Sequence, residues 1–202
     1  MTINRRTMLG LTAATLPILA TRNALAQAQT KGGMDALECI ATRRSIRKFL
    51  DKPVPDDMVH TLLEAAMTAP SAMNEQPWHF ITVTRKDKLK AAFDAGCLPA
   101  ATAALGILIC GDPSLDKSGL QTWPLDCSNA AMNVLLAANA IGLGSVWTIG
   151  FPNEKRMADY RTIFAIPAQI MPFNFICLGW PEKPGWREDR FKPDRIKKET
   201  WA

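Results

Sequence analysis

Residues 124–149 read PLDCSNAAMNVLLAANAIGLGSVWTI, and this stretch decides much of the fold. From Pro124 to Ile141 the chain is apolar almost all round at the length of a helix, which predicts a central, buried helix. Gly142 is a natural stop, because glycine readily adopts the left-handed backbone found at helix ends. The run from Gly144 to Ile149 predicts a strand directly afterwards.

Apolar periodicity predicts further helices and strands on both sides of this stretch. The predicted helices cover residues 34–42, 56–69, 86–95 and 153–164, and the predicted strands cover 79–84, 105–110 and 171–178. This order favours an α/β or α+β domain. No strand is followed by the glycine motif of a Rossmann or P-loop phosphate site, so both of these nucleotide sites are excluded.

The start of the chain is expected to be an export signal. Arg5 and Arg6 precede an apolar stretch too short to span a bilayer comfortably, and Ala24-Leu25-Ala26 fits a signal-peptidase site. The arginine pair resembles a twin-arginine signal, and general secretion is the alternative. We expect a signal peptide over 1–26, a linker over 27–33 and a folded domain over 34–202, carried to the periplasm by the twin-arginine machinery and not inserted in the membrane.

Composition narrows the class of function. Hydrophobic residues make up 48% of the chain and charged residues 21%, as in ordinary soluble globular proteins. The formal net charge of +5 comes from basic residues spread along the chain, so a nucleic-acid partner is not expected. The five cysteines are odd in number and widely spaced, which fits neither a disulfide framework nor a metal site.

A basic segment follows the first predicted helix. Residues 43–48, RRSIRK, carry four basic side chains with no acid nearby in the sequence. If the helix extends this far, Arg43 and Arg47 lie four residues apart on one face, close to the Ser45 hydroxyl, which suits a bound phosphate. A solvated basic surface is an equally good interpretation of the segment taken alone.

A second segment, residues 69–78 (APSAMNEQPW), places a hydroxyl and two amides between prolines. Rigid amide groups suit the edge of a planar heterocycle that both donates and accepts hydrogen bonds, as the flavin pyrimidine does. Ordinary turn chemistry is the alternative for these residue types.

Several motifs, taken in order, resemble the FMN-binding signature of the nitroreductase family. They lie at residues 43–49, 69–71, 74–78, 126–128, 142–148, 170–173, 179–181 and 190–191. The resemblance covers nearly all of residues 34–202. It implies an α+β fold with a central mixed sheet flanked by helices, and an intertwined homodimer with FMN at the subunit interface.

By position, the same resemblance implies which residues bind FMN. The implied residues are Arg43, Arg44, Ser45 and Arg47 for the phosphate and ribityl chain, Pro70, Ser71, Asn74 and Gln76 for the ring, Ile149 and Gly150 near its reactive edge, and Arg190 in the tail. One departure concerns Glu188, which stands where some family members have a lysine. This acid implies weaker binding of the phosphate by the tail.

The implied activity is that of an FMN-dependent oxidoreductase working by a ping-pong cycle. A donor passes hydride to flavin N5 and leaves, and a nitroaromatic or quinone then takes the electrons. No side chain is expected to be catalytic, and His60 and His79 are expected to be structural. Export leaves the donor open between NADH, NADPH and a periplasmic reductant. The alternatives are a dehalogenase-like or flavin-consuming relative, a non-catalytic flavin-binding protein, and a scaffold that binds no flavin.

Overall fold

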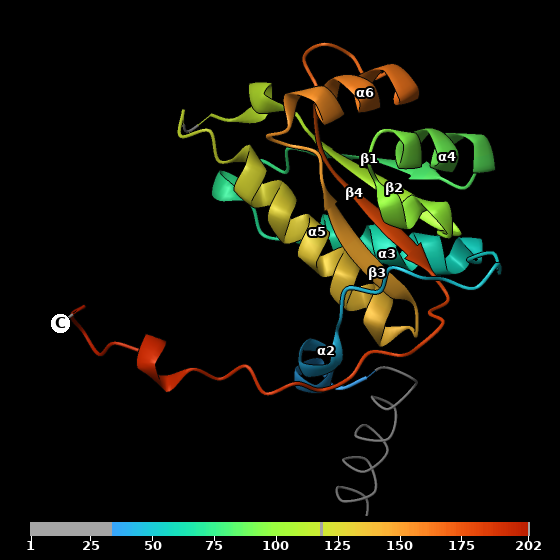
Figure 1. Cartoon of the computed structure of the whole chain (residues 1–202). Coiled ribbons are helices and arrows are strands. Elements are labelled where there is room, and N and C mark those ends of the chain that lie inside the picture. Colours follow the sequence, from blue (N-terminus) through green and yellow to red (C-terminus); the bar gives the residue numbers. More distant parts are fainter. Residues whose placement is uncertain (1–33, 118, 202) are drawn as a thin grey trace, which may run out of the picture. The chain divides into compact units, whose positions relative to one another are not determined.

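The computed structural model describes residues 34–117 and 119–201, which form an α+β domain (Figure 1). Four strands build one sheet in the order β1-β2-β4-β3, and each neighbouring pair is antiparallel. The strands are β1 (Trp78–Val83), β2 (Leu105–Gly111), β3 (Gly144–Ile149) and β4 (Met171–Gly179). The resemblance implies a mixed sheet, whereas the one parallel pairing within the described chain is an isolated bridge between Ser45 and Ser145.

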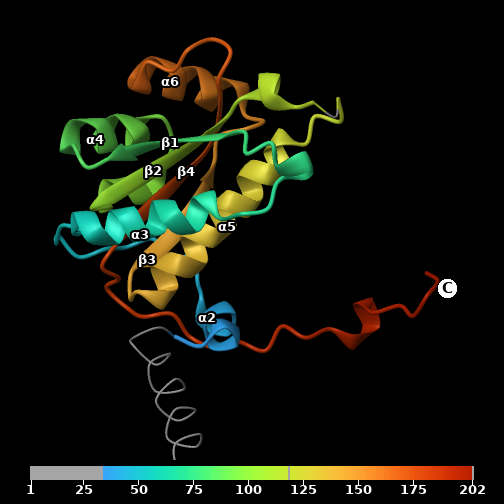
Figure 2. The same cartoon turned by 180° about the vertical axis from the view of Figure 1, so that it is seen from behind.

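Helices cover both faces of the sheet (Figures 1 and 2). On one face, α3 (Asp56–Met67) packs against α5 (Trp123–Ala140), and on the other lie α4 (Lys86–Asp94) and α6 (Glu154–Phe164). The short α2 (Ala36–Thr42) packs against α5. Single 3₁₀ turns complete the elements: η1 (Ala72–Asn74), η2 (Leu98–Ala101), η3 (Pro113–Leu115) and η4 (Pro193–Arg195).

Helix α5 is the central helix that its sequence predicts. Ala130, Ala131, Val134 and Ala138 have no exposed surface, because α3 and the sheet enclose the helix on two sides. It ends at Ala140, and Gly142 follows with a φ of +84°, which favours glycine. The predicted stop is therefore confirmed.

The other elements begin and end within three residues of their predicted limits. The predicted cap of α6 is confirmed, since the side chain of Asn153 accepts a hydrogen bond from the backbone N–H of Arg156 at 2.9 Å. The predicted signal peptide (1–26) and linker (27–33) lie outside the described residues. Among residues that the structure describes, no helix is both long enough and apolar enough to cross a bilayer.

Candidate active site

The basic segment after α2 is extended. Helix α2 ends at Thr42, and Arg43 has a φ of −57° and a ψ of 127°. Ser45 pairs with Ser145 at the start of β3, and Arg47 donates a hydrogen bond to the Ser45 carbonyl at 3.2 Å. The prediction that a helix places Arg43 and Arg47 on one face is therefore wrong. Successive side chains of an extended chain point to opposite sides, so the alternate residues Arg43, Ser45 and Arg47 share one side because the segment is extended.

Arg44 lies on the opposite side of this segment and is buried. Its Nη1 donates to the carbonyl oxygens of Ala41 and Arg43, at 3.0 and 2.7 Å, and its guanidinium stacks over the ring of Trp186. Nε and Nη2 are buried and make no hydrogen bond. Such groups are costly to bury unless an anion or another acceptor reaches them. Arg44 thus fixes the chain where α2 ends and the basic segment begins, and it adds a buried positive charge there.

The C-terminal tail returns across the end of α2. The backbone at Gly185 passes so close to the Thr42 carbonyl oxygen that an added Cβ would lie 2.3 Å from it. The tail brings Arg190 close to Arg43, whose pKa is lowered by burial and then by the charges of Arg44 and Arg190. Arg190 therefore lies near the basic segment, and its contact with a phosphate stays a prediction.

Arg43, Arg44 and Arg190 form an arginine cluster, and Glu188 is the acid next to it. Its Oε2 lies 2.7 Å from Nη2 of Arg190 and 3.8 Å from Nε of Arg44. The hydrogen bond and charge of Arg190 hold the pKa of Glu188 below its usual value. Arg190 and Arg44 thus share one carboxylate, while Arg43 lies near both of these guanidinium groups and has no acid of its own among the ion pairs of the described chain. The surplus positive charge suits a small dianion such as a phosphate monoester.

A cavity of about 230 Å³ adjoins the arginine cluster. It is lined by Met34, Thr42, Arg43, Arg44, Ile46, Asn139, Gly142, Leu143, Gly144, Ser145, Pro181, Pro184 and Gly185. These residues come from the end of α2, the last turn of α5, the start of β3 and the tail. Of the predicted phosphate residues, Arg43 and Arg44 line this cavity, whereas Ser45, Arg47 and Arg190 do not. The charge surplus and the two unbonded nitrogens of Arg44 suit a small anion such as a phosphate group.

The proline loop has a strained backbone. Met73, Asn74 and Gln76 adopt φ values of 51°, 57° and 50°, which residues other than glycine rarely do. Ser71 Oγ accepts a hydrogen bond from the Gln76 N–H at 3.0 Å, and Gln76 Nε2 donates to Asn74 Oδ1 at 2.8 Å. Strain of this kind persists only where surrounding contacts fix it, and it is frequent at ligand sites.

Helix α5 supplies those surrounding contacts. The backbone N–H of Ala72 donates to Asp126 Oδ1 at 2.9 Å, and Asn129 Nδ2 donates to the Pro70 carbonyl at 3.2 Å. At the other end of α5, Asn139 Nδ2 donates to the Cys39 carbonyl at 3.0 Å. Sequence reasoning assigned no role to these side chains. The signal was their polar character within an otherwise apolar helix.

The proline loop and the basic segment therefore lie near opposite ends of α5. The helix rises by about 20 Å between Asp126 and Asn139, at 1.5 Å per residue. One chain does not bring the two segments together. By contrast, the basic segment joins β3 at Ser145, and Ile149 lies only about 13 Å further along the same strand.

The end of β3 is fixed although its last side chain is exposed. Ile149 is 56% exposed, whereas Gly150 is buried and its N–H donates to the Phe173 carbonyl at 3.0 Å. A Cβ on Gly150 would lie 2.6 Å from that carbonyl oxygen, so the position requires glycine. Arg156 Nη1 donates to the Ile149 carbonyl at 2.7 Å and holds the turn in place. Sequence reasoning missed Arg156, because its spacing from Ile149 forms no motif.

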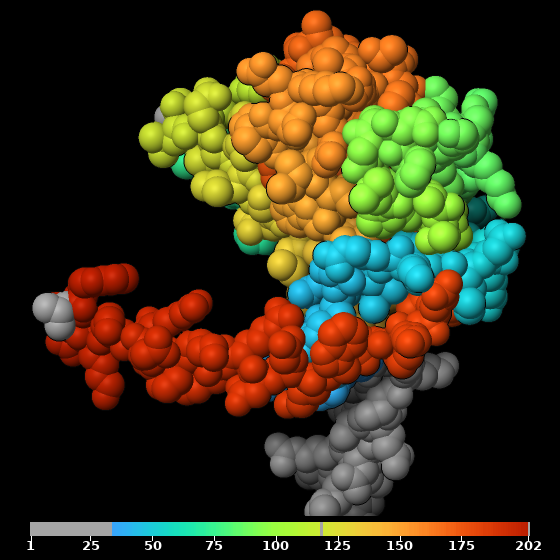
Figure 3. All heavy atoms as spheres, in the orientation of Figure 1, coloured from blue at the N-terminus to red at the C-terminus, as the bar shows by residue number. Residues whose placement is uncertain are grey.

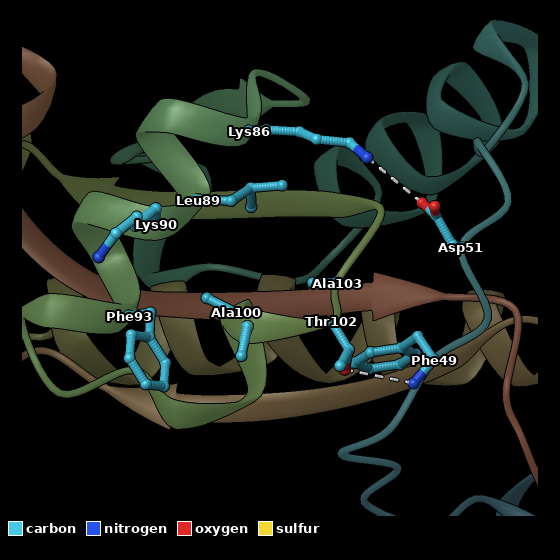
Figure 4. Close-up of a pocket in the computed structure, with 10 residues that line it drawn as sticks. Phe49, Asp51, Lys86, Leu89, Lys90, Phe93, Ala100, Thr102 and Ala103 are labelled. Atoms are coloured by element: carbon cyan, nitrogen blue, oxygen red, sulfur yellow. Dashed lines mark hydrogen bonds and ion pairs between the residues drawn. The ribbon is translucent and has the colours of Figure 1, made fainter.

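A larger cavity, of about 500 Å³, lies between α4, η2 and the segment after Phe49 (Figure 4). Lys86 and Asp51 form an ion pair of 3.5 Å at its edge, and Leu89 and Ala100 line it. None of the predicted site residues lines this cavity. Its walls are largely apolar and its charged groups are exposed, so the arginine-lined cavity is the stronger candidate despite its smaller volume.

The fold and the motifs agree with known proteins. Residues 40–104 and 99–180 match the Nitroreductase family. A protein of Archaeoglobus fulgidus, provisionally named NADH dehydrogenase/NAD(P)H nitroreductase, is 47% identical over 174 residues, which cover 83% of this chain and 99% of that protein. A crystal structure of a protein of the same provisional name from Parabacteroides distasonis has a TM-score of 0.78 at 34% identity, covering 82% of this chain and 98% of that one. A provisionally named nitroreductase of Desulfovibrio desulfuricans, solved in complex with FMN, has a TM-score of 0.68 at 27% identity over 84% of this chain and 99% of that one. The predicted fold is confirmed, and the chain belongs to the nitroreductase family.

Proposed function

We propose that this protein is an FMN-dependent oxidoreductase that passes hydride from a reduced donor to nitroaromatic or quinone acceptors in a ping-pong cycle. The observation that carries the proposal is the arginine cluster beside the start of β3, with its adjoining cavity and its surplus of positive charge. FMN as cofactor is supported by the FMN-containing structure of the Desulfovibrio relative. Bound FMN supplies the hydride-accepting atom, so the protein itself needs no redox group.

The residues present divide the work of binding. Arg43, Ser45 and Arg47 would hold the phosphate and the ribityl chain, while Arg44 would add charge from below. A cofactor lying along β3 would reach Ile149 and Gly150, where the fixed turn leaves an exposed edge for donor and acceptor. Both substrates would use this edge in turn, which is the structural requirement of a ping-pong cycle.

The ring-binding loop would come from a second subunit. Because the proline loop lies about 20 Å along α5 from the basic segment of its own chain, Ser71, Asn74 and Gln76 cannot complete the site next to it. We therefore propose a homodimer in which each FMN contacts both chains. Rigid amides at the pyrimidine edge would stabilise negative charge on the reduced ring.

The C-terminal arm supports the homodimer. After Arg190 the tail extends away from the sheet (Figures 1 and 3). Apolar side chains are exposed along it, with Phe191 at 70%, Ile196 at 56% and Trp201 at 87%, and Leu37 on α2 is 76% exposed. Exposed apolar groups in this number favour burial against another chain. Light scattering at micromolar concentration should give twice the mass of one chain.

Anaerobic titration tests the oxidoreductase proposal. The purified protein should be yellow, lose flavin absorbance on addition of NADH, NADPH or dithionite, and regain it with a quinone or nitroaromatic. Colourless protein that takes up no added FMN would exclude a flavoprotein. Flavin that is reduced but not reoxidised by these acceptors would favour the non-catalytic flavin-binding alternative, and consumption of the flavin itself would favour the flavin-consuming relative.

The location is part of the proposal. The arginine pair at residues 5 and 6 supports export of the folded, FMN-loaded protein to the periplasm by the twin-arginine route. Replacing both arginines with lysine should leave the protein in the cytoplasm of a host that carries this machinery. Unchanged export of the double variant would favour general secretion instead.

A further inference from the structure

Two thiols meet in the core on the face of the sheet that α4 and α6 cover. Cys97, in the turn before η2, and Cys177, near the C-terminal end of β4, have no exposed surface, and their sulfur atoms are 3.4 Å apart. They are far apart in sequence, so the fold alone brings them together. Neither lies in the candidate flavin site, and the proposed oxidoreductase cycle uses neither.

Polar groups surround Cys97 within this core. Its Sγ lies 3.3 Å from Thr148 Oγ1, whose hydroxyl donates to the Phe175 carbonyl at 2.7 Å. The hydroxyl of Tyr160 is also buried in this core and makes no hydrogen bond within the described chain. Cys97 thus has polar partners on β3 and β4, unlike a thiol that only fills space in an apolar core.

The two thiols differ in pKa. The hydrogen bond from Cys177 is the main cause that lowers the pKa of Cys97 to about 7, and the same contact raises the pKa of Cys177. Cys97 is therefore the group that loses its proton first, and Cys177 remains a thiol beside it. A thiolate next to a thiol is the arrangement in which an oxidised sulfur is quickly captured by its neighbour.

We infer that Cys97 and Cys177 form a reversible disulfide when the protein meets hydrogen peroxide. The Cys97 sulfur attacks one peroxide oxygen, the O–O bond breaks, and Cys97 sulfenic acid and hydroxide form. The Cys177 sulfur then displaces the sulfenic hydroxyl, and its proton leaves with the departing oxygen as water. In total, two thiols are oxidised to one disulfide while one peroxide is reduced to two waters.

The bond would join the turn after α4 to the inner strand β4 of the sheet. Only a modest movement is needed, because the sulfur atoms already touch and a disulfide is about 2 Å long. Since both thiols are buried, peroxide reaches them when this turn opens locally, and the reaction should be slow compared with that of an exposed thiol.

Alkylation and mass spectrometry test the inference on the purified protein. Protein reduced with dithiothreitol is freed of reductant, exposed to hydrogen peroxide, and then alkylated in denaturant. We expect the number of alkylated cysteines to fall from five to three, one cross-linked peptide that contains Cys97 and Cys177, and full reversal by dithiothreitol. Retention of five reactive thiols, or a cross-link between other cysteines, would overturn the inference.

Three variants separate the roles of the thiols. Cys177→Ser should still form a sulfenic acid at Cys97, which dimedone captures, but no disulfide. Cys97→Ser should keep all its remaining thiols. Cys110→Ser is the matched control, because Cys110 is also buried, in the neighbouring strand β2, and its pKa is raised to about 12 by burial. On exposure to peroxide, Cys110→Ser should lose two free thiols, as the unmodified protein does. If Cys110→Ser loses no thiols, Cys110 belongs to the disulfide and the assigned pair is wrong.

Discussion

Asp126 accepts a hydrogen bond from the backbone N–H of Ala72 at 2.9 Å and so ties the strained proline loop to α5. Its second oxygen is buried without a partner, so the carboxylate serves this one contact. We expect Asp126→Ala to lower the free energy of unfolding by about 1–3 kcal/mol and to weaken FMN binding about tenfold. Urea unfolding and fluorescence titration of the flavin-free protein with FMN measure the two effects.

Asn133→Ala is the matched control for this prediction. Asn133 also lies on α5 and donates to a backbone carbonyl, that of Ala65 at 2.9 Å, but on α3 instead of the proline loop. It should lower stability by a similar amount and leave the affinity for FMN within about twofold. Equal loss of FMN affinity in both variants would show that general destabilisation, not the loop, is responsible.

In the proposed binding mode, Glu188 would compete with the FMN phosphate for Arg190 and Arg44. Replacing it with glutamine removes the negative charge and frees these guanidinium groups. Because exposed ion pairs contribute less than about 1 kcal/mol, FMN affinity should rise by only about two- to fivefold. The gain should shrink as salt increases, since the cluster is partly exposed. Glu154→Gln, the control, removes an exposed carboxylate at the start of α6 and should leave the affinity for FMN unchanged. Weaker FMN binding by Glu188→Gln would mean that Glu188 positions Arg190.

Arg43 and Arg44 should fail in different ways. Arg43→Gln removes a half-buried charge on the side that we propose faces the phosphate, so FMN affinity should fall about 10- to 100-fold while the unfolding midpoint stays nearly constant. Arg44→Gln removes a buried anchor of the turn and the stacking on Trp186, so stability should fall first. Melting temperatures and FMN titrations of the two variants give the comparison. A reversed pattern would assign the phosphate contact to Arg44.

The local features of this chain could be predicted, whereas its long-range distances could not. Helix α5 and its stop at Gly142 follow from apolar spacing and backbone preference, which are properties of neighbouring residues. Helical spacing predicts that Arg43 and Arg47 lie on one side of the chain. They do so in an extended segment instead, because Ser45 pairs with Ser145 and the helix ends at Thr42. The separation of the proline loop from this segment depends on where α5 lies, and no pattern of residues encodes that position.

The polar contacts of α5 and the thiol pair illustrate the same limit. Cys110 and Cys177 each lie in an apolar run of the sequence, which is typical of a small buried hydrophobe, and burial is the main influence on the pKa of Cys110. No motif marks Cys97. Only the antiparallel neighbours and the turn after α4 place the two sulfurs 3.4 Å apart. Their chemistry is a product of the fold and not of any motif.

The thiol pair should give peroxide oxidation a distinct pH dependence. The side chains that act on Cys97 are Cys177 on β4, Thr148 on β3 and Tyr160 on α6. The nearby Arg156 on α6 donates to the backbone carbonyl of Gly96 at 3.2 Å. The pKa of Tyr160 is raised by burial and by Cys97, so the tyrosine stays neutral over the accessible pH range.

Since the thiolate reacts and the pKa of Cys97 is about 7, the rate of disulfide formation should rise about tenfold between pH 6 and pH 8 and then level off. Quenching the reaction at intervals with acid and counting free thiols measures this profile. A rate that keeps rising steeply beyond pH 8 would indicate an ordinary thiol as the attacking group, and would remove the hydrogen bond from Cys177 as the cause of reactivity.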